Sequence, residues 1–133
     1  MEAILVKDQK AAAFVMEDGT FEGVYRITEK VCGDVEQVTG VRPKIIKWQG
    51  ALQPAQVYVA TLGNSEMSEA IAEEEGIELS SLCGKRECFL FQVLKNGSLL
   101  IAGSDKRGTI YGLFHISELM GVSPFVHFAD VVP

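Results

Sequence analysis

The segment that most constrains the fold is ECFLFQVLKNGSLLIAG, residues 87–103. Two apolar runs flank the dipeptide Asn96-Gly97, which favours a type I′ turn because both central residues of that turn need a positive φ. We therefore predict an antiparallel hairpin, with one strand at about residues 88–94 and the other at about residues 98–102. An enforced antiparallel pair excludes a purely parallel sheet, so a sheet that contains this hairpin must be mixed or antiparallel.

Three segments show the spacing of apolar residues that is typical of amphipathic helices. Glycines are placed to end two of them, Gly40 after the first and Gly121 after the third. Gly33 lies inside the first helix and costs about 1 kcal/mol relative to alanine, which suggests a close approach of another backbone there. The predicted helices are residues 21–39, a segment through Glu74 that is capped by Asn64 or Ser65, and about residues 105–120.

Further apolar runs, rich in β-branched and aromatic residues, predict strands that separate these helices. The predicted order is strand, helix, two strands, helix, hairpin and helix, and the tail FVHFADVVP forms one more extended segment. We therefore expect an α+β fold, an α/β two-layer sandwich with a mixed sheet of about four to five strands and helices mainly on one face. The predicted single strands are residues 11–16, 44–48 and 56–63.

Length and composition indicate one globular domain. The chain has 133 residues, of which 47% are hydrophobic, enough for a real core. Its formal net charge is −6 and no basic stripe is visible, so we expect no nucleic-acid partner. Acidic residues gather in one run without the spacing of a calcium loop, which indicates a solvated helix face. They are Glu66, Glu69, Glu73, Glu74, Glu75 and Glu78.

Cysteine and histidine usage supports neither a disulfide framework nor a metal site. The three cysteines, Cys32, Cys83 and Cys88, are an odd number, and the chain has only two histidines. Buried free thiols are the expectation, and pairing of Cys83 with Cys88 depends on local geometry. We expect no metal and no cofactor.

The N-terminus lacks the basic start and long apolar run of a signal peptide. No stretch has the length of a membrane span, so we expect a soluble chain with no membrane partner.

The turn between Gly103 and Gly108 is the candidate binding site. A strand, a glycine and the exposed amides of a helix N-terminus together form a generic anion site, to which two basic residues add charge. The pattern is half of a phosphate loop, because Thr109 follows the second glycine directly and the lysine of that motif is missing. The candidate ligand-binding residues are Ser104, Asp105, Lys106 and Arg107.

A structural interpretation of the same turn is favoured, because caps and turns greatly outnumber sites. In it Ser104 or Asp105 caps the helix, and Gly103 frees the backbone at the strand exit. Gly108 and Gly112 share one helix face and let the helix lie close to the sheet, while the two basic side chains point to water.

Other arrangements for catalysis are weaker. Tyr111, His115 and Glu118 lie on neighbouring turns of one helix, although a partly buried, hydrogen-bonded histidine is the more common situation. No serine lies in a Gly-x-Ser-x-Gly elbow. Asp105 and Asp130 could be proposed as the two carboxylates of a glycosidase, but no feature of the sequence selects this pair, because nothing in it fixes the distance between them.

The chain nevertheless resembles the N-terminal domain of glycoside hydrolase family 115, which contains the xylan α-1,2-glucuronidases. The resemblance is sharp in IAGSDKRGTIYG, ELMGVSP and FADVVP, and extends to VTG at residues 38–40 and ATLG at residues 60–63. It implies a fold like the small α/β domain that precedes the catalytic barrel in several carbohydrate-active families, including hexosaminidases.

The resemblance also implies that the acid/base machinery lies in a C-terminal (β/α)8 barrel, which needs about 250 residues. This chain stops at Pro133, so we expect no catalytic residues in it and no hydrolase activity from it alone. Its partners would be that barrel and, through the intact protein, a glucuronoxylan-like carbohydrate. Family members tend to carry tryptophans where residues 125–128 are Phe-Val-His-Phe, which leaves the substrate open. Many relatives are secreted or periplasmic, and the compartment here stays open.

Three hypotheses follow. The chain is a scaffolding domain of a larger hydrolase, a small-ligand or anion-binding module, or a domain that associates with itself. In the last case, an apolar docking face left exposed would form homodimers.

Overall fold

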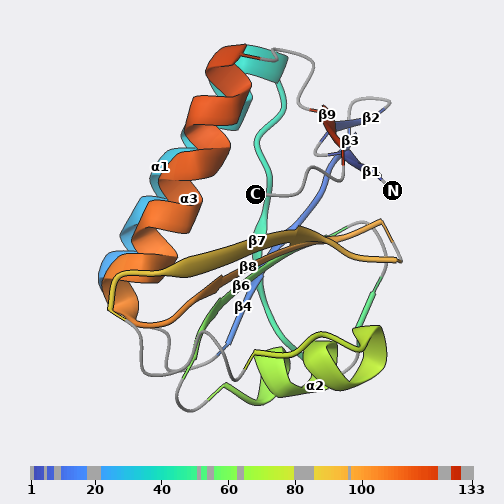
Figure 1. The fold of residues 1–133 in the computed structure, drawn as a ribbon. Coiled ribbons are helices and arrows are strands. Elements are labelled where there is room, and N and C mark those ends of the chain that lie inside the picture. The colour runs from blue at the N-terminus through green and yellow to red at the C-terminus, as the bar shows by residue number, and fades with distance from the viewer. Residues whose placement is uncertain are drawn as a thin grey trace.

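The computed structural model describes residues 2–4, 6–7, 10–17, 22–50, 52–53, 56–62, 65–79, 86–95, 97–122 and 127–129. Its centre is a five-stranded sheet (Figure 1). The strands are β4 (Phe14–Met16), β5 (Ile45–Lys47), β6 (Val57–Thr61), β7 (Phe89–Val93) and β8 (Leu99–Gly103). They lie in the order β5-β4-β6-β8-β7, and only the last pair is antiparallel. The predicted mixed sheet and hairpin are both confirmed.

The helices cover both faces of this sheet, two on one side and one on the other. The long helices α1 (Glu22–Thr39) and α3 (Lys106–Val122) lie side by side on one face, and the shorter α2 (Glu66–Glu75) covers the opposite face (Figure 1). The α/β architecture with helices mainly on one face is therefore as predicted. None of the helices in the described residues is long and apolar enough to cross a membrane.

Alternation along the strands divides the core in two. Successive strand side chains point to opposite faces, and because both faces are covered the central strands are apolar throughout. On the side of α1 and α3, the core joins Phe14, Met16, Val57, Val59, Leu99 and Ile101 to Val24, Val31, Val35, Leu113 and Ile116. On the side of α2, it joins Val15, Tyr58, Ala60, Leu100 and Ala102 to Met67 and Ile71.

Two short ladders lie outside the main sheet. Strand β1 (Glu2–Ile4) pairs antiparallel with β9 (His127–Ala129), and β2 (Val6–Lys7) pairs with β3 (Lys10–Ala11). The extended tail is thus confirmed at residues 127–129, where it pairs with the N-terminal segment (Figure 1).

Several helix ends follow the predicted chemistry. Ser65 is the N-cap of α2, where its hydroxyl accepts the N–H of Ser68 at 3.0 Å. Gly40 follows α1 with φ +81°, a left-handed conformation that glycine adopts without strain. In the sequence, Thr20 precedes the first predicted helix as a possible N-cap and Pro124 follows the third as a break. Both residues, and the alternative cap Asn64, lie outside the described residues.

Two glycine predictions were wrong. Helix α3 continues through Gly121 to Val122, because a glycine can remain helical at a cost of about 1 kcal/mol. Gly33 has no other backbone against it; the atom nearest to a Cβ there would be a guanidinium nitrogen of Arg42, at 3.4 Å.

The hairpin turn begins one residue earlier than expected. The N–H of Gly97 donates to the carbonyl of Leu94 at 3.1 Å, and the N–H of Leu94 donates to Ser98 at 2.8 Å. Gly97 then adopts φ +83°, as in three-residue loops that close with a left-handed residue. Asn96 itself lies outside the described residues.

Candidate functional site

The glycines of α3 mark a contact between the helix and the hairpin. A Cβ on Gly108 would overlap the carbonyl oxygen of Cys88, just before β7. A Cβ on Gly112 would press on a methyl group of Ile101 and on the ring of Phe89. This confirms that Gly108 and Gly112 let α3 approach the sheet, and the approach to Cys88 is one of backbone to backbone.

Gly103 is required by the neighbouring Thr109. A Cβ on Gly103 would overlap the backbone nitrogen and hydroxyl of Thr109. That hydroxyl is fully buried, lies 2.7 Å from the hydroxyl of Thr61, and lies 3.2 Å from the carbonyl of Ala60. Thr109 directly follows Gly108, where a phosphate loop has its lysine, and its hydroxyl links α3 to β6.

Asp105, rather than Ser104, caps α3. Its carboxylate accepts the N–H of Gly108 at 2.8 Å and the N–H of Glu87 at 3.0 Å. These two hydrogen bonds, that from Gly108 first, lower the pKa of Asp105. Ser104 instead clamps the hairpin: its N–H donates to the carbonyl of Cys88 at 2.8 Å, and its hydroxyl accepts the N–H of Cys88 at 3.0 Å.

The two basic residues of the turn differ in their surroundings. Arg107 donates to the carboxylate of Glu87 at 2.9 Å, and this hydrogen bond raises the pKa of Arg107. Lys106 is exposed as expected, and its stem lies against Gly23 at the start of α1. An incoming anion would therefore meet a helix N-terminus already capped by Asp105 and an arginine already paired.

His115 packs between aromatic rings rather than in a catalytic cluster. Its ring meets Phe91 edge-on, with 4.9 Å between centroids, and lies 5.7 Å from Phe89. Its Nδ1 is 3.8 Å from the carboxylate of Glu118, and Tyr111 is 44% exposed. Asp130, the second carboxylate considered above, lies outside the described residues.

The acidic run and the two described cysteines form no site that the structure shows. The glutamates of the run are exposed except Glu75, which accepts the N–H of Lys95 at 2.7 Å. Cys32 and Cys88 are free thiols, and burial raises the pKa of Cys32 to about 11. Cys83 lies outside the described residues, among which no cluster of metal-ligating side chains occurs.

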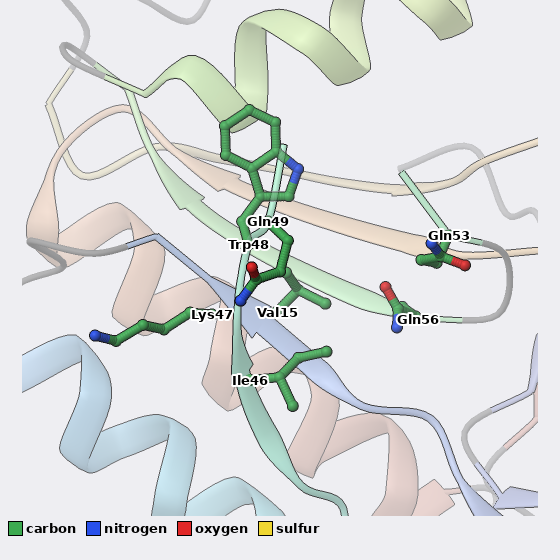
Figure 2. A pocket seen from close by; sticks show the side chains of 7 residues that line it. All are labelled: Val15, Ile46, Lys47, Trp48, Gln49, Gln53 and Gln56. Atoms are coloured by element: carbon green, nitrogen blue, oxygen red, sulfur yellow. The ribbon is translucent and has the colours of Figure 1, made fainter. Parts of the chain in front are cut away.

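A hollow beside β5 was not anticipated from the sequence. It is a half-open hollow of about 90 Å³ on the side of the sheet that faces α2. Figure 2 shows the indole of Trp48 standing beside Gln49, with Gln53 and Gln56 lying across from them. The lining residues are Val15, Ile46, Lys47, Trp48, Gln49, Gln53 and Gln56.

The far rim of this hollow is fixed by two hydroxyl groups from the sheet. Tyr58 accepts the N–H of Gln53 at 2.7 Å and donates to its carbonyl at 2.8 Å. Ser98 accepts the N–H of Gln56 at 3.0 Å and donates to the carbonyl of Gln53 at 3.1 Å. The Tyr58 side chain is fully buried, which raises its pKa. A signal existed in the sequence: the single tryptophan is followed by three glutamines within eight residues.

No protein-family model matches the chain, and no curated protein matches it significantly in sequence. Solved structures do match it. A family 115 4-O-methyl-α-glucuronidase, described as specific for decorated arabinogalactans, aligns with a TM-score of 0.67 and 27% identity over 90% of this chain. A family 138 enzyme targeting pectin rhamnogalacturonan II aligns over 90% with a TM-score of 0.57 and 15% identity. CpGH84D aligns over 98% with a TM-score of 0.67 and 12% identity.

This chain spans only 16%, 11% and 20% of those three chains, respectively. The fold therefore places it among small α/β domains that occur within larger glycoside hydrolases. It resembles the N-terminal domains of those enzymes. The two matches below 25% identity bear on the fold alone.

Proposed function

We propose that this chain is a non-catalytic accessory domain, N-terminal to the catalytic barrel of a hydrolase that resembles family 115. One observation carries the proposal: 90% of the chain aligns, at 27% identity, with only 16% of a family 115 glucuronidase. A domain that accounts for so small a share of an enzyme is suited to support a catalytic unit built elsewhere in the chain. The substrate class of the whole protein, a uronic-acid-bearing glycan, rests on the same likeness, because that enzyme is a 4-O-methyl-α-glucuronidase. Glucuronoxylan in particular rests on the resemblance of the sequence to family 115.

The contacts at residues 103–108 support a scaffolding role. This run, GSDKRG, is the centre of the resemblance to family 115, and its polar groups act mainly on the chain itself. Asp105 caps α3, Ser104 clamps the hairpin and Thr109, directly after the run, links α3 to β6. A residue set that joins a helix to a sheet in this way gives the domain a rigid edge.

The outer side of the helix layer is the docking surface that we propose. Tyr25 on α1 and Tyr111 on α3 are each 44% exposed. Tyrosine combines a large apolar ring with a polar tip, and this makes it frequent at protein interfaces. The occupant is the catalytic domain of the same protein, and homodimers would form when this surface is left uncovered.

A second role is a contact between the basic pair and an anionic part of the substrate in the intact enzyme. Lys106 and Arg107 occupy the first turn of α3, which carries no acidic residue. Cations are disfavoured there by the helix dipole. Arg107 is paired with Glu87 at 2.9 Å, so the exposed Lys106 is the cation on which this contact depends most. Titration of the intact enzyme with glucuronic acid tests this role: the Lys106→Ala/Arg107→Ala variant should bind more weakly, and an unchanged affinity would dispose of it.

The main proposal is tested by the gene and by the purified chain. We expect the reading frame to continue beyond Pro133 with enough codons for a barrel, about 250 residues. We expect the purified 133-residue chain to release no sugar from glucuronoxylan or from chromogenic glycosides. A reading frame that ends at residue 133, together with glycoside turnover by the purified monomer, would refute the proposal.

A further inference from the structure

We propose that the hollow beside Trp48 binds a neutral pyranose sugar. This site goes beyond the accessory role and does not depend on it, because it lies within this chain and can be tested with the chain alone. Three observations support it: the apolar surface, the amide-rich rim and the anchoring of that rim.

The apolar surface suits the carbon-bound hydrogens of a sugar ring. Val15 and Ile46 are neighbours in the register of β4 and β5 and form one side of the hollow, while Trp48 stands beside it (Figure 2). Ile46 is 38% exposed, one of three exposed large hydrophobic side chains in the described part of the chain. Binding pockets for small molecules combine such apolar walls with a few placed polar groups.

The polar groups suit hydroxyls. A primary amide offers both donors and an acceptor, and each sugar hydroxyl likewise donates and accepts. Gln49, Gln53 and Gln56 supply three such amides around the hollow, and none of its described lining residues carries a carboxylate. Lys47 belongs to the lining, but Figure 2 shows its side chain directed away from the glutamines, so the site favours a neutral ligand.

The indole N–H of Trp48 adds an unsatisfied donor at this site. It is buried and has no hydrogen-bond partner among the described residues. Buried polar groups are almost always paired, so an unpaired one calls for an explanation. A sugar hydroxyl that reached this nitrogen would satisfy it.

The rim is also held in place before any ligand arrives. Tyr58 and Ser98 fix the backbone of Gln53 and Gln56 through four hydrogen bonds. A rim that is already ordered lowers the entropy cost of binding. The affinity expected for a single sugar is still modest, with a Kd of about 1 mM or weaker.

The test is a titration of the 133-residue chain with xylose, galactose and glucose, followed by ¹⁵N NMR. Trp48 is the only tryptophan, so its indole signal is unambiguous. We expect at least one sugar to shift this signal and the side-chain amide signals of the rim glutamines saturably, and inorganic phosphate to shift none of them. Absence of such shifts with all three sugars up to about 100 mM, or shifts with phosphate, would overturn the proposal.

Variants separate binding at this site from non-specific effects. Gln49→Ala/Gln56→Ala removes two side-chain amides and leaves the backbone hydrogen bond from Gln56 to Ser98 in place. This variant should bind the sugar about tenfold more weakly, a loss of about 1.4 kcal/mol. Gln37→Ala, which changes an exposed glutamine on α1 outside the hollow, should bind as the wild type does. Equal binding by the double variant and the wild type would refute the assignment.

Discussion

The carbonyl oxygen of Cys88 lies where a Cβ on residue 108 would have to be, so only glycine fits there without movement. The same carbonyl accepts the N–H of Ser104 at 2.8 Å, and this hydrogen bond holds the carbonyl in place. The start of β7, the end of β8 and the first turn of α3 are thereby joined through backbone atoms. This joint therefore leaves no room for a side chain at position 108.

Gly108→Ala should destabilise the chain. Alanine favours a helix by about 1 kcal/mol over glycine, but the clash with a fixed carbonyl forces a backbone shift of the overpacking kind. We expect a net loss of about 1–3 kcal/mol in the free energy of unfolding, measured with urea.

Gly33→Ala is the matched control, because it also lies inside a helix. Its Cβ would meet only the flexible end of Arg42, at 3.4 Å, so the variant should gain about 0.5–1 kcal/mol. Equal effects of the two substitutions would show that helix propensity, and not the contact with Cys88, governs position 108.

Asp105 should make stability depend on pH. Its pKa is lowered in the folded chain from an ordinary value of 3.8, so the unfolded chain binds the proton more tightly. The stabilisation is therefore present above the unfolded pKa and is lost as the pH falls through the lower, folded pKa. We expect Asp105→Asn to unfold at lower urea concentration than the wild type near neutral pH, and the difference to shrink below about pH 4. A difference that stays constant down to the acid limit of folding would contradict this role.

Cys32 should resist alkylation in the folded chain. Burial raises its pKa from 9.0 to about 11, which lowers its thiolate fraction about a hundredfold, and its side chain is fully buried. Cys88 is a half-buried thiol and should react first with iodoacetamide, as followed by peptide mass spectrometry. Labelling of Cys32 at the rate of Cys88 under native conditions would show that α1 opens readily.

Tyr25→Ser/Tyr111→Ser tests the proposed docking surface. Both tyrosines are 44% exposed and lie on the helix surface, so the free energy of unfolding of the isolated chain should change by only about 0.5 kcal/mol for each substitution. Light scattering should show that the wild-type chain associates with itself and that this variant does so less. Dimers of equal strength in both proteins would place the interface elsewhere.

Most of the fold was predictable because local signals agreed with one another. The apolar runs around Asn96-Gly97 specified the hairpin, and Ser65 and Gly40 marked helix ends. The prediction failed at Gly121, where a local stop signal competed with a helix that was already formed. It failed at Gly33 because sequence spacing does not say which neighbour faces a helix surface.

The sites were less predictable, because they depend on contacts between distant residues. The sequence left Ser104 and Asp105 as alternative caps of the last helix. In the structure Ser104 bonds to Cys88, whereas Asp105 bonds to Glu87 and is the cap. The hollow beside Trp48 depends on Tyr58 and Ser98 holding the rim, and no motif encodes that pairing.

The central claim, that this chain is a packing domain of a larger hydrolase, is tested most directly by calorimetry of the protein that the claim predicts, this chain joined to its catalytic domain. Its thermal unfolding is compared with that of the 133-residue chain and of the remaining protein, each expressed alone. The account predicts one cooperative transition at a higher temperature than either part shows separately. Two independent transitions, each unshifted from that of the separate part, would contradict it.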